Sequence, residues 1–109
     1  MAFFAAANRI KASSPEALEK VLEAFKGRAG FVEKRPGFKG LLVLADRNKL
    51  EVLVLSIWES RDAFKAWVES EEFKKAHERA RARRLEGVES EGYEYEVVEA
   101  SGPLFESRE

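Results

Sequence analysis

The sequence predicts an α+β domain of the ferredoxin-like βαββαβ type, an antiparallel sheet with its helices on one face. Apolar residues alternate or run continuously in four segments of strand length, and they recur at helical spacing in the segments between. The order is strand, helix, strand, strand, helices, strand. The chain has 109 residues, so we expect a single domain over residues 1–109, with a loose tail from about residue 101.

The first predicted strand covers residues 2–12 and contains an unusual polar residue. Phe4, Asn8 and Ile10 share one face of this strand, and asparagine is a poor strand residue. A buried amide without a hydrogen-bond partner costs about 1–3 kcal/mol. Two interpretations of Asn8 stay open: a neighbouring backbone group satisfies the amide, or the amide points into a cavity and binds a ligand.

The next segment has the signals of a helix. Ser13 and Ser14 supply a capping hydroxyl, and Pro15 suits the first helical turn. Four apolar residues then follow at helical spacing, and two glycines mark the end of the helix. These residues are Leu18, Val21, Leu22 and Phe25, followed by Gly27 and Gly30.

Residues 38–45 and 50–58 predict two central strands joined by a hairpin turn at 46–49. Both strands are apolar on both faces, which indicates that both faces of the sheet are covered. The helices of this chain can cover one face, but too little chain remains for the other. We therefore expect a homodimer that packs through the sheet face.

Ser60 and Ser70 predict the starts of two further helices. His77, the single histidine of the chain, follows Phe73 by one helical turn and is expected on the same inward side. Alternating residues at 93–98 predict the last strand.

Composition excludes several classes of function. The net charge is −1, which gives no general attraction to nucleic acid or to an anionic membrane, and no apolar run approaches the length of a membrane span. The basic run at 78–84 has no interleaved aromatic residues and is typical of a solvated helix face. The absence of cysteine excludes disulfides and thiolate metal sites and suits a cytoplasmic protein. Abundant Glu, Lys and Arg with no glutamine is typical of proteins from hot environments.

Three residues remain as candidates for chemistry: Asn8, Trp58 and His77. Taken singly, Trp58 at a strand end and His77 on an apolar helix face are each more typical of a core. Together with Asn8, they place an amide, a bulky ring and an imidazole where a sheet meets a helix. Imidazole is a common axial ligand of haem iron.

Six segments carry a resemblance to a known family. They are Asn8-Arg9, Phe25-Lys26-Gly27-Arg28, Pro36-Gly37-Phe38-Lys39-Gly40, Trp58-Glu59-Ser60 with Ala63-Phe64-Lys65-Ala66-Trp67, Ala76-His77 with Arg81, and Tyr95-Glu96-Val97-Val98. Over roughly residues 3 to 100 the sequence resembles the antibiotic biosynthesis monooxygenase superfamily, whose fold is a dimeric α/β-barrel. Within it, the asparagine, tryptophan and histidine resemble those of haem-degrading monooxygenases of the IsdG and MhuD type.

The resemblance implies a role for each candidate residue. His77 would be the axial ligand of haem iron, Trp58 would press on the porphyrin and ruffle it, and Asn8 would donate a hydrogen bond beside the bound ligand. Phe25 would form a wall of the haem site. Arg28 and Arg81 would partner the propionates or support the groups that do.

The implied reaction is oxidative opening of the porphyrin with release of iron. Haem would be both substrate and cofactor, with dioxygen and an electron-donating reductase as the external electron donor. Two alternatives stay open. One is a cofactor-free monooxygenase of a small quinol or polyketide-like aromatic, and the other is a non-catalytic haem-binding or stress-related dimer.

Overall fold

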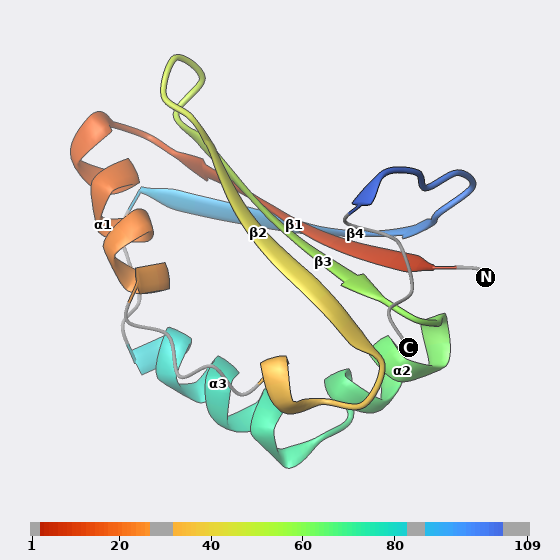
Figure 1. Ribbon diagram of the computed structural model, residues 1–109. Helices are drawn as coiled ribbons and strands as arrows, with labels where there is room; N and C mark the ends of the chain where they lie inside the picture. The colour runs from red at the N-terminus through yellow and green to blue at the C-terminus, as the bar shows by residue number, and fades with distance from the viewer. Residues whose placement is uncertain (1–2, 27–31, 83–86, 104–109) are drawn as a thin grey trace.

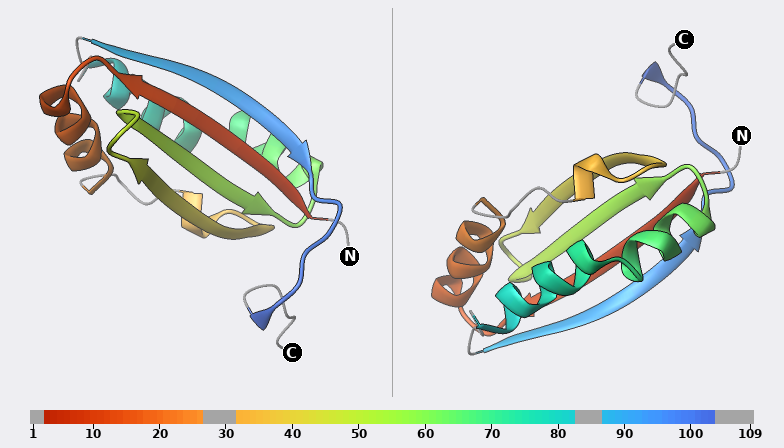
Figure 2. Two further views of the ribbon diagram at one scale, coloured as in Figure 1. Left: turned by 90° about the horizontal axis from the view of Figure 1, so that it is seen from above. Right: turned by 90° about the horizontal axis from the view of Figure 1, so that it is seen from below.

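The computed structural model describes residues 3–26, 32–82 and 87–103, and gives the backbone alone at 77–82. Within these ranges the chain forms a four-stranded antiparallel sheet with α-helices on one face, which confirms the predicted ferredoxin-like fold (Figures 1 and 2). The elements are β1 Phe4–Ala12, α1 Pro15–Lys26, the 3₁₀ turn η1 Val32–Lys34, β2 Phe38–Asp46, β3 Glu51–Trp58, α2 Arg61–Val68, α3 Glu71–Ala82 and β4 Val88–Glu96.

The strand order is β2-β3-β1-β4, so the two strands from the middle of the chain lie on one side of β1 and the last strand lies on the other. Residues two apart share a face, and the register therefore aligns rows of side chains across the sheet. One row joins Phe38, Trp58 and Phe4, and another joins Val52 and Ile10.

The strand boundaries differ from the prediction at β4 and at the β2–β3 hairpin, where β2 extends to Asp46. The last strand runs from Val88 to Glu96, whereas the sequence predicted residues 93–98. Its first half is polar and does not alternate, but β1 supplies backbone partners along the whole length, so pairing extends the strand toward Val88. Leu50, predicted to start the third strand, lies in the hairpin turn with φ 54°.

The three predicted helix starts are confirmed by capping hydrogen bonds. Each cap is a serine whose Oγ accepts a 3.1 Å hydrogen bond from the backbone N–H three residues later in the chain. The capping serines are Ser14, Ser60 and Ser70. The described part of α1 ends at Lys26. Gly27 and Gly30, predicted to end this helix, lie outside the described residues, as do residues 104–109 of the predicted tail.

The core has two separate parts on the helix face. At one end, α1 packs on the sheet and buries the α1 cluster, which consists of Ile10, Leu18, Val21 and Val52. At the other end, α2 and the first turn of α3 bury the α2 cluster, which consists of Phe4, Trp58 and Trp67 with Phe73 packed against them. The helices thus cover the two ends of the sheet through different side chains.

The turn before β2 holds the α2 end of the sheet together. Gly37 has φ 81°, which favours glycine, and a Cβ there would lie 2.6 Å from the Cβ of Ala63 at the start of α2. Its carbonyl accepts a 2.7 Å hydrogen bond from the N–H of Glu59. Trp58 is therefore followed at once by a close backbone contact that fixes the chain entering α2.

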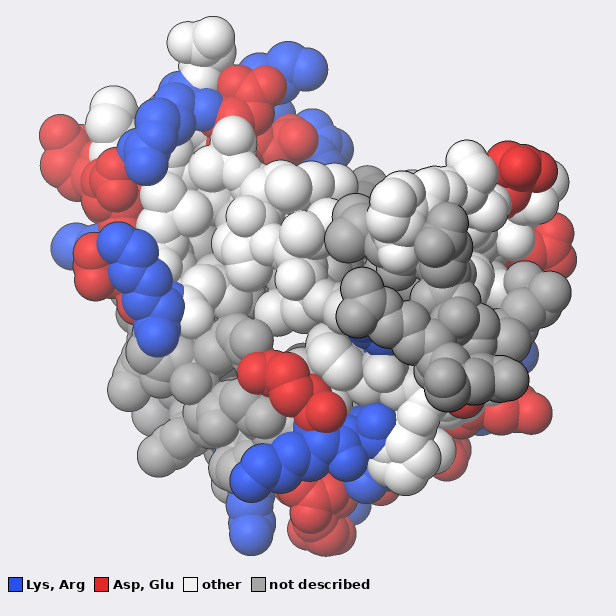
Figure 3. Space-filling view, viewed as in Figure 1, with Lys and Arg blue, Asp and Glu red and all other residues white. Residues whose placement is uncertain are grey.

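The opposite face of the sheet carries no helix among the described elements (Figure 2). Leu42 and Leu44 are 52% and 45% exposed on this open face, and Tyr95 is 53% exposed. Figure 3 shows the molecule from the same side as Figure 1, with uncharged residues in white. White residues cover the β2 side of the sheet, and charged side chains gather at the β2–β3 hairpin and along α1. The part of the chain described contains no helix long and apolar enough to cross a membrane.

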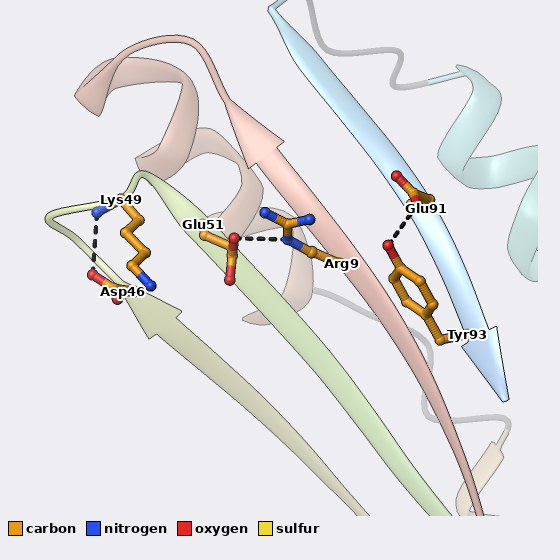
Figure 4. A network of polar contacts seen from close by, with 6 residues as sticks. All are labelled: Arg9, Asp46, Lys49, Glu51, Glu91 and Tyr93. Atoms are coloured by element: carbon orange, nitrogen blue, oxygen red, sulfur yellow. Dashed lines mark hydrogen bonds and ion pairs between the residues drawn. The ribbon is translucent and has the colours of Figure 1, made fainter. Parts of the chain in front are cut away.

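A polar network of residues from β1, β3 and β4 lies at the hairpin end of the open face (Figure 4). Arg9 Nε donates a 2.8 Å hydrogen bond to Glu51, which raises the pKa of Arg9. The hydroxyl of Tyr93 donates to Glu91, and this bond raises the pKa of Tyr93. At neutral pH the network therefore holds a charged arginine beside a neutral phenol.

Candidate functional site

Four residues form one row across the middle of the helix face. Val43 of β2 lies opposite Val54 of β3, Val54 lies opposite Asn8 of β1, and Asn8 lies opposite Gly92 of β4. We call this set the middle row. Asn8 is four residues from Phe4 along β1, so the row lies roughly 13 Å along the strand from the sheet end that holds Trp58.

Most of the middle row is exposed, although it lies between two buried ends. Val43 is 37% exposed, Asn8 and Gly92 are exposed, and Val54 is half-buried. By contrast, Val52 and Trp58, on either side of Val54 along β3, are both 0% exposed. Val43, Asn8 and Gly92 thus keep accessible surface between the α1 and α2 clusters, on the side of the sheet below which α3 runs (Figure 2).

Asn8 occupies the strand face on which the sequence placed it, but it is not buried. Its exposure removes the cost that a buried amide would carry. Within the described part of the chain its side chain has no hydrogen-bond partner, so a neighbouring backbone does not satisfy the amide there. Among the described residues, no group occupies the donor or the acceptor of this amide.

Trp58 ends β3 as expected and has no exposed surface. The rings of Phe38 and Phe64 meet the indole edge-on, with centroids 5.4 and 5.8 Å away. Its Nε1 donates a 3.0 Å hydrogen bond to Ser56 Oγ, and Ser56 Oγ in turn donates at 3.3 Å to the carbonyl of Ala6. The indole is thus held in the α2 cluster by both packing and a polar contact.

Ser56 did not emerge as a candidate from the sequence. The signal was nevertheless present, because Ser56 is the single polar residue in the apolar run from Val52 to Trp58. A serine at that position has no propensity advantage in a strand, so it needs another reason.

The helix-borne candidates are described only in part. Phe25 is half-buried and packs against the α1 cluster. His77 and Arg81 belong to α3, but their side chains lie outside the described part of the structure. Arg28 lies outside the described residues altogether, so the structure does not test whether these side chains meet Asn8 and Trp58.

An ion pair that the sequence did not suggest ties α3 to the rest of the domain. Arg35, between η1 and β2, has its Nη1 3.5 Å from a carboxylate oxygen of Glu72 in the first turn of α3. Its side chain is 24% exposed, so the pair is partly shielded from water. This contact and Phe73 anchor the start of the helix that carries His77 one turn later.

The arrangement suits a flat ligand that is largely apolar. Two valines, an amide and a glycine without a side chain form a mostly apolar row with one polar side chain. No group of three or more His, Cys, Asp or Glu residues that could hold a metal ion occurs among residues whose side chains are described. The described residues thus offer a binding surface for a ligand and no metal cluster built from side chains alone.

Comparison with known proteins identifies the family. The family model for antibiotic biosynthesis monooxygenases matches residues 3–79. The chain is a member of this family. It is 35% identical over 83 residues to the staphylobilin-producing heme oxygenase 1 of Staphylococcus aureus strain Newman, covering 73% of this chain and 76% of that protein.

Solved structures of the family include proteins of two kinds. The heme-degrader MhuD of Mycobacterium tuberculosis, solved with two hemes in its active site, is 27% identical and has a TM-score of 0.69, covering 91% of this chain and 99% of that one. SnoaB of Streptomyces nogalater, a cofactor-independent oxygenase, is 22% identical with a TM-score of 0.67, covering 94% and 99%. The likeness to SnoaB extends to the fold alone. Membership of the family therefore indicates a monooxygenase without deciding its substrate.

Proposed function

We propose that this protein is a haem-degrading monooxygenase that opens the porphyrin oxidatively and releases iron. The observation that carries the proposal is the exposed amide of Asn8 in the middle row, between two buried clusters. The 35% identity to a staphylococcal heme oxygenase supports the same substrate. Haem supplies the iron and the ring that is oxidised, so the chain needs to bind, orient and shield it.

The middle row fits the chemistry of a porphyrin. The ring is flat and mostly apolar, and burying apolar surface against Val43 and Val54 contributes about 25 cal/mol per Å². Gly92 adds no side chain that would hold a flat ligand away from the sheet. Asn8 is the one polar group of the row and would donate a hydrogen bond on the ligand side of the iron.

His77 would be the axial ligand of haem iron. Its position in α3 is one helical turn beyond Phe73, which packs in the α2 cluster. A neutral imidazole suits this role, and its second nitrogen can be held by a hydrogen bond. Phe25 would wall the site from α1, and Arg28 and Arg81 would partner the propionates.

Trp58 would press on the porphyrin and distort it. In the ligand-free chain its indole has no exposed surface, so the proposal requires that haem binding uncovers part of the ring. The N–H edge of the indole lies beside Ser56, on the side of Trp58 that faces the middle row. This edge is the part of the ring nearest to a ligand on the row.

The proposed reaction also needs partners. Dioxygen and an electron-donating reductase would supply the oxidant and the electrons. Two copies of the chain would pack through the open face, where Leu42, Leu44 and Tyr95 are exposed. Covering this apolar surface by a second copy would stabilise the domain.

Titration with hemin tests the binding step. We expect saturable Soret absorption for the wild-type protein and its loss or strong weakening for His77→Ala. Lys75→Ala is the matched control, because Lys75 is an exposed residue of the same helix. If the wild-type protein gives no saturable Soret band, the proposal is wrong. A cofactor-free monooxygenase of a small quinol or polyketide-like aromatic then becomes the better hypothesis.

A further inference from the structure

Ser56 makes a hydrogen-bonded connection between Trp58 and the backbone of β1. Its Oγ accepts the indole N–H of Trp58 at 3.0 Å and donates to the carbonyl of Ala6 at 3.3 Å. Ser56 lies opposite Ala6 in the register, and both residues lie on the helix face between the Trp58 row and the middle row. The connection therefore runs from the buried indole toward Asn8, two residues beyond Ala6.

The indole needs this hydrogen bond because it is fully buried. An indole has a single donor, and leaving a buried donor unpaired costs about 1–3 kcal/mol. The hydroxyl of Ser56 is the acceptor that this donor finds beside the α2 cluster, whose members are hydrophobic residues. Because Ser56 precedes Trp58 by two residues on the same face, the bond directs the N–H edge back along β3.

Packing holds the ring, and the hydrogen bond adds a directional contact. Phe38 and Phe64 meet the indole edge-on and offer apolar contacts, which do not pair with the indole N–H. The carbonyl of Ala6 orients the hydroxyl by accepting its hydrogen bond, and a lone pair of the hydroxyl oxygen then accepts the indole N–H. The hydrogen bond with Ser56 is directional, so it selects one edge of the ring for the side of the middle row.

We infer that Ser56 is a positioning residue that sets the orientation of the Trp58 indole toward the middle row. The consequence for catalysis rests on the proposed function, because it assumes that haem lies on the row. The orientation itself does not depend on that function. Ser56 lies one row from the middle row on the same face, and the inference assigns its effect to the orientation of Trp58.

Three variants separate the hydroxyl from the volume of the side chain. Ser56→Ala removes the hydroxyl, Ser56→Thr keeps it, and Ser56→Val has the shape of threonine without it. The chain has two tryptophans, so ¹⁵N-labelled protein should give two indole N–H signals, and Trp58→Phe assigns them. Trp67 reports whether the α2 cluster stays folded.

The first measurement is independent of haem. We expect the Trp58 indole signal to shift, and its hydrogen exchange to accelerate, in Ser56→Ala and Ser56→Val. The signal should stay near its wild-type position in Ser56→Thr, and the Trp67 signal should stay unchanged in all three. An unchanged Trp58 signal in Ser56→Ala, the variant least disturbing to packing, would overturn the inference whether or not Ser56→Val folds.

The second measurement separates rate from affinity in the haem-loaded protein. Ser56→Ala and Ser56→Val should slow the loss of the Soret band by roughly tenfold, because small misplacements beside a reacting group carry costs of that order or more. Their hemin affinity should stay close to that of the wild type, Ser56→Thr should restore the rate, and Trp58→Phe should also slow the loss more than it weakens binding. Wild-type rates in Ser56→Ala would refute the inference and leave the proposed function standing.

If the wild type binds no hemin, the proposed function fails and the indole signals alone decide the role of Ser56.

Discussion

Asn8 of β1 lies directly opposite Gly92 of β4 on the face of the sheet that carries the helices. The amide therefore has open space beside it, because a Cβ built at Gly92 meets no atom within 4 Å. Gly92 does not have the positive φ that favours glycine, so its backbone conformation suits other residues. A glycine inside a strand weakens the strand. Such a glycine often marks a site where a ligand approaches the backbone closely.

Filling this space should block the ligand without unfolding the domain. We expect Gly92→Leu to weaken hemin binding by about tenfold, or 1.4 kcal/mol, because the new side chain would occupy the surface beside Asn8. Ser90→Leu is the matched control, since Ser90 lies on the same strand and face, one row away beside Ile10. Soret titration measures both variants. Equal affinities for the two would show that the ligand does not lie on the middle row.

The two faces of β2 should respond differently to charge. Leu44→Glu places a carboxylate on the open face and should convert a dimer to monomers, because a buried unpaired charge is costly. Val43→Glu changes the neighbouring residue on the helix face, and should leave the dimer intact while weakening hemin binding. Light scattering after size exclusion measures the mass, and a wild-type monomer would contradict the proposed packing through the open face.

The α1 cluster should dominate the stability of its end of the sheet. Leu18 is 2% exposed and packs with Ile10 and Val52, so Leu18→Ala should lower the free energy of unfolding by about 2–5 kcal/mol. Lys20→Ala, on the exposed side of the same helix, should change it by less than about 0.5 kcal/mol. Urea unfolding followed by circular dichroism measures both. Comparable losses in the two variants would contradict the assignment of this cluster as core.

Most of the fold was predictable because local signals and tertiary structure agree. Ser60 was predicted to cap a helix, and its Oγ does accept a hydrogen bond from the backbone N–H of Ala63. The last strand was the exception. Residues 88–92 carry no apolar alternation, and their strand conformation comes from pairing with β1, which no local window contains.

The candidate site was predictable only in part. The strand face of Asn8 follows from a period of two, and the register confirms that Phe4, Asn8 and Ile10 share it. Its exposure depends on where α1 and α2 end, which the sequence pattern does not specify. The bond between Ser56 and Trp58 likewise depends on the rotamer of a buried ring.

The most direct test of the central claim is turnover of the haem-loaded protein. Hemin-loaded wild type is given ascorbate and catalase in air-saturated buffer, and Soret absorption and chelatable iron are followed together, with His77→Ala as the blank. Catalase removes free peroxide, so the oxidation that remains depends on the protein. We expect the Soret band to disappear while iron is released in equal amount. A Soret band that persists, with the iron still bound, would contradict haem degradation and leave a protein that only binds haem.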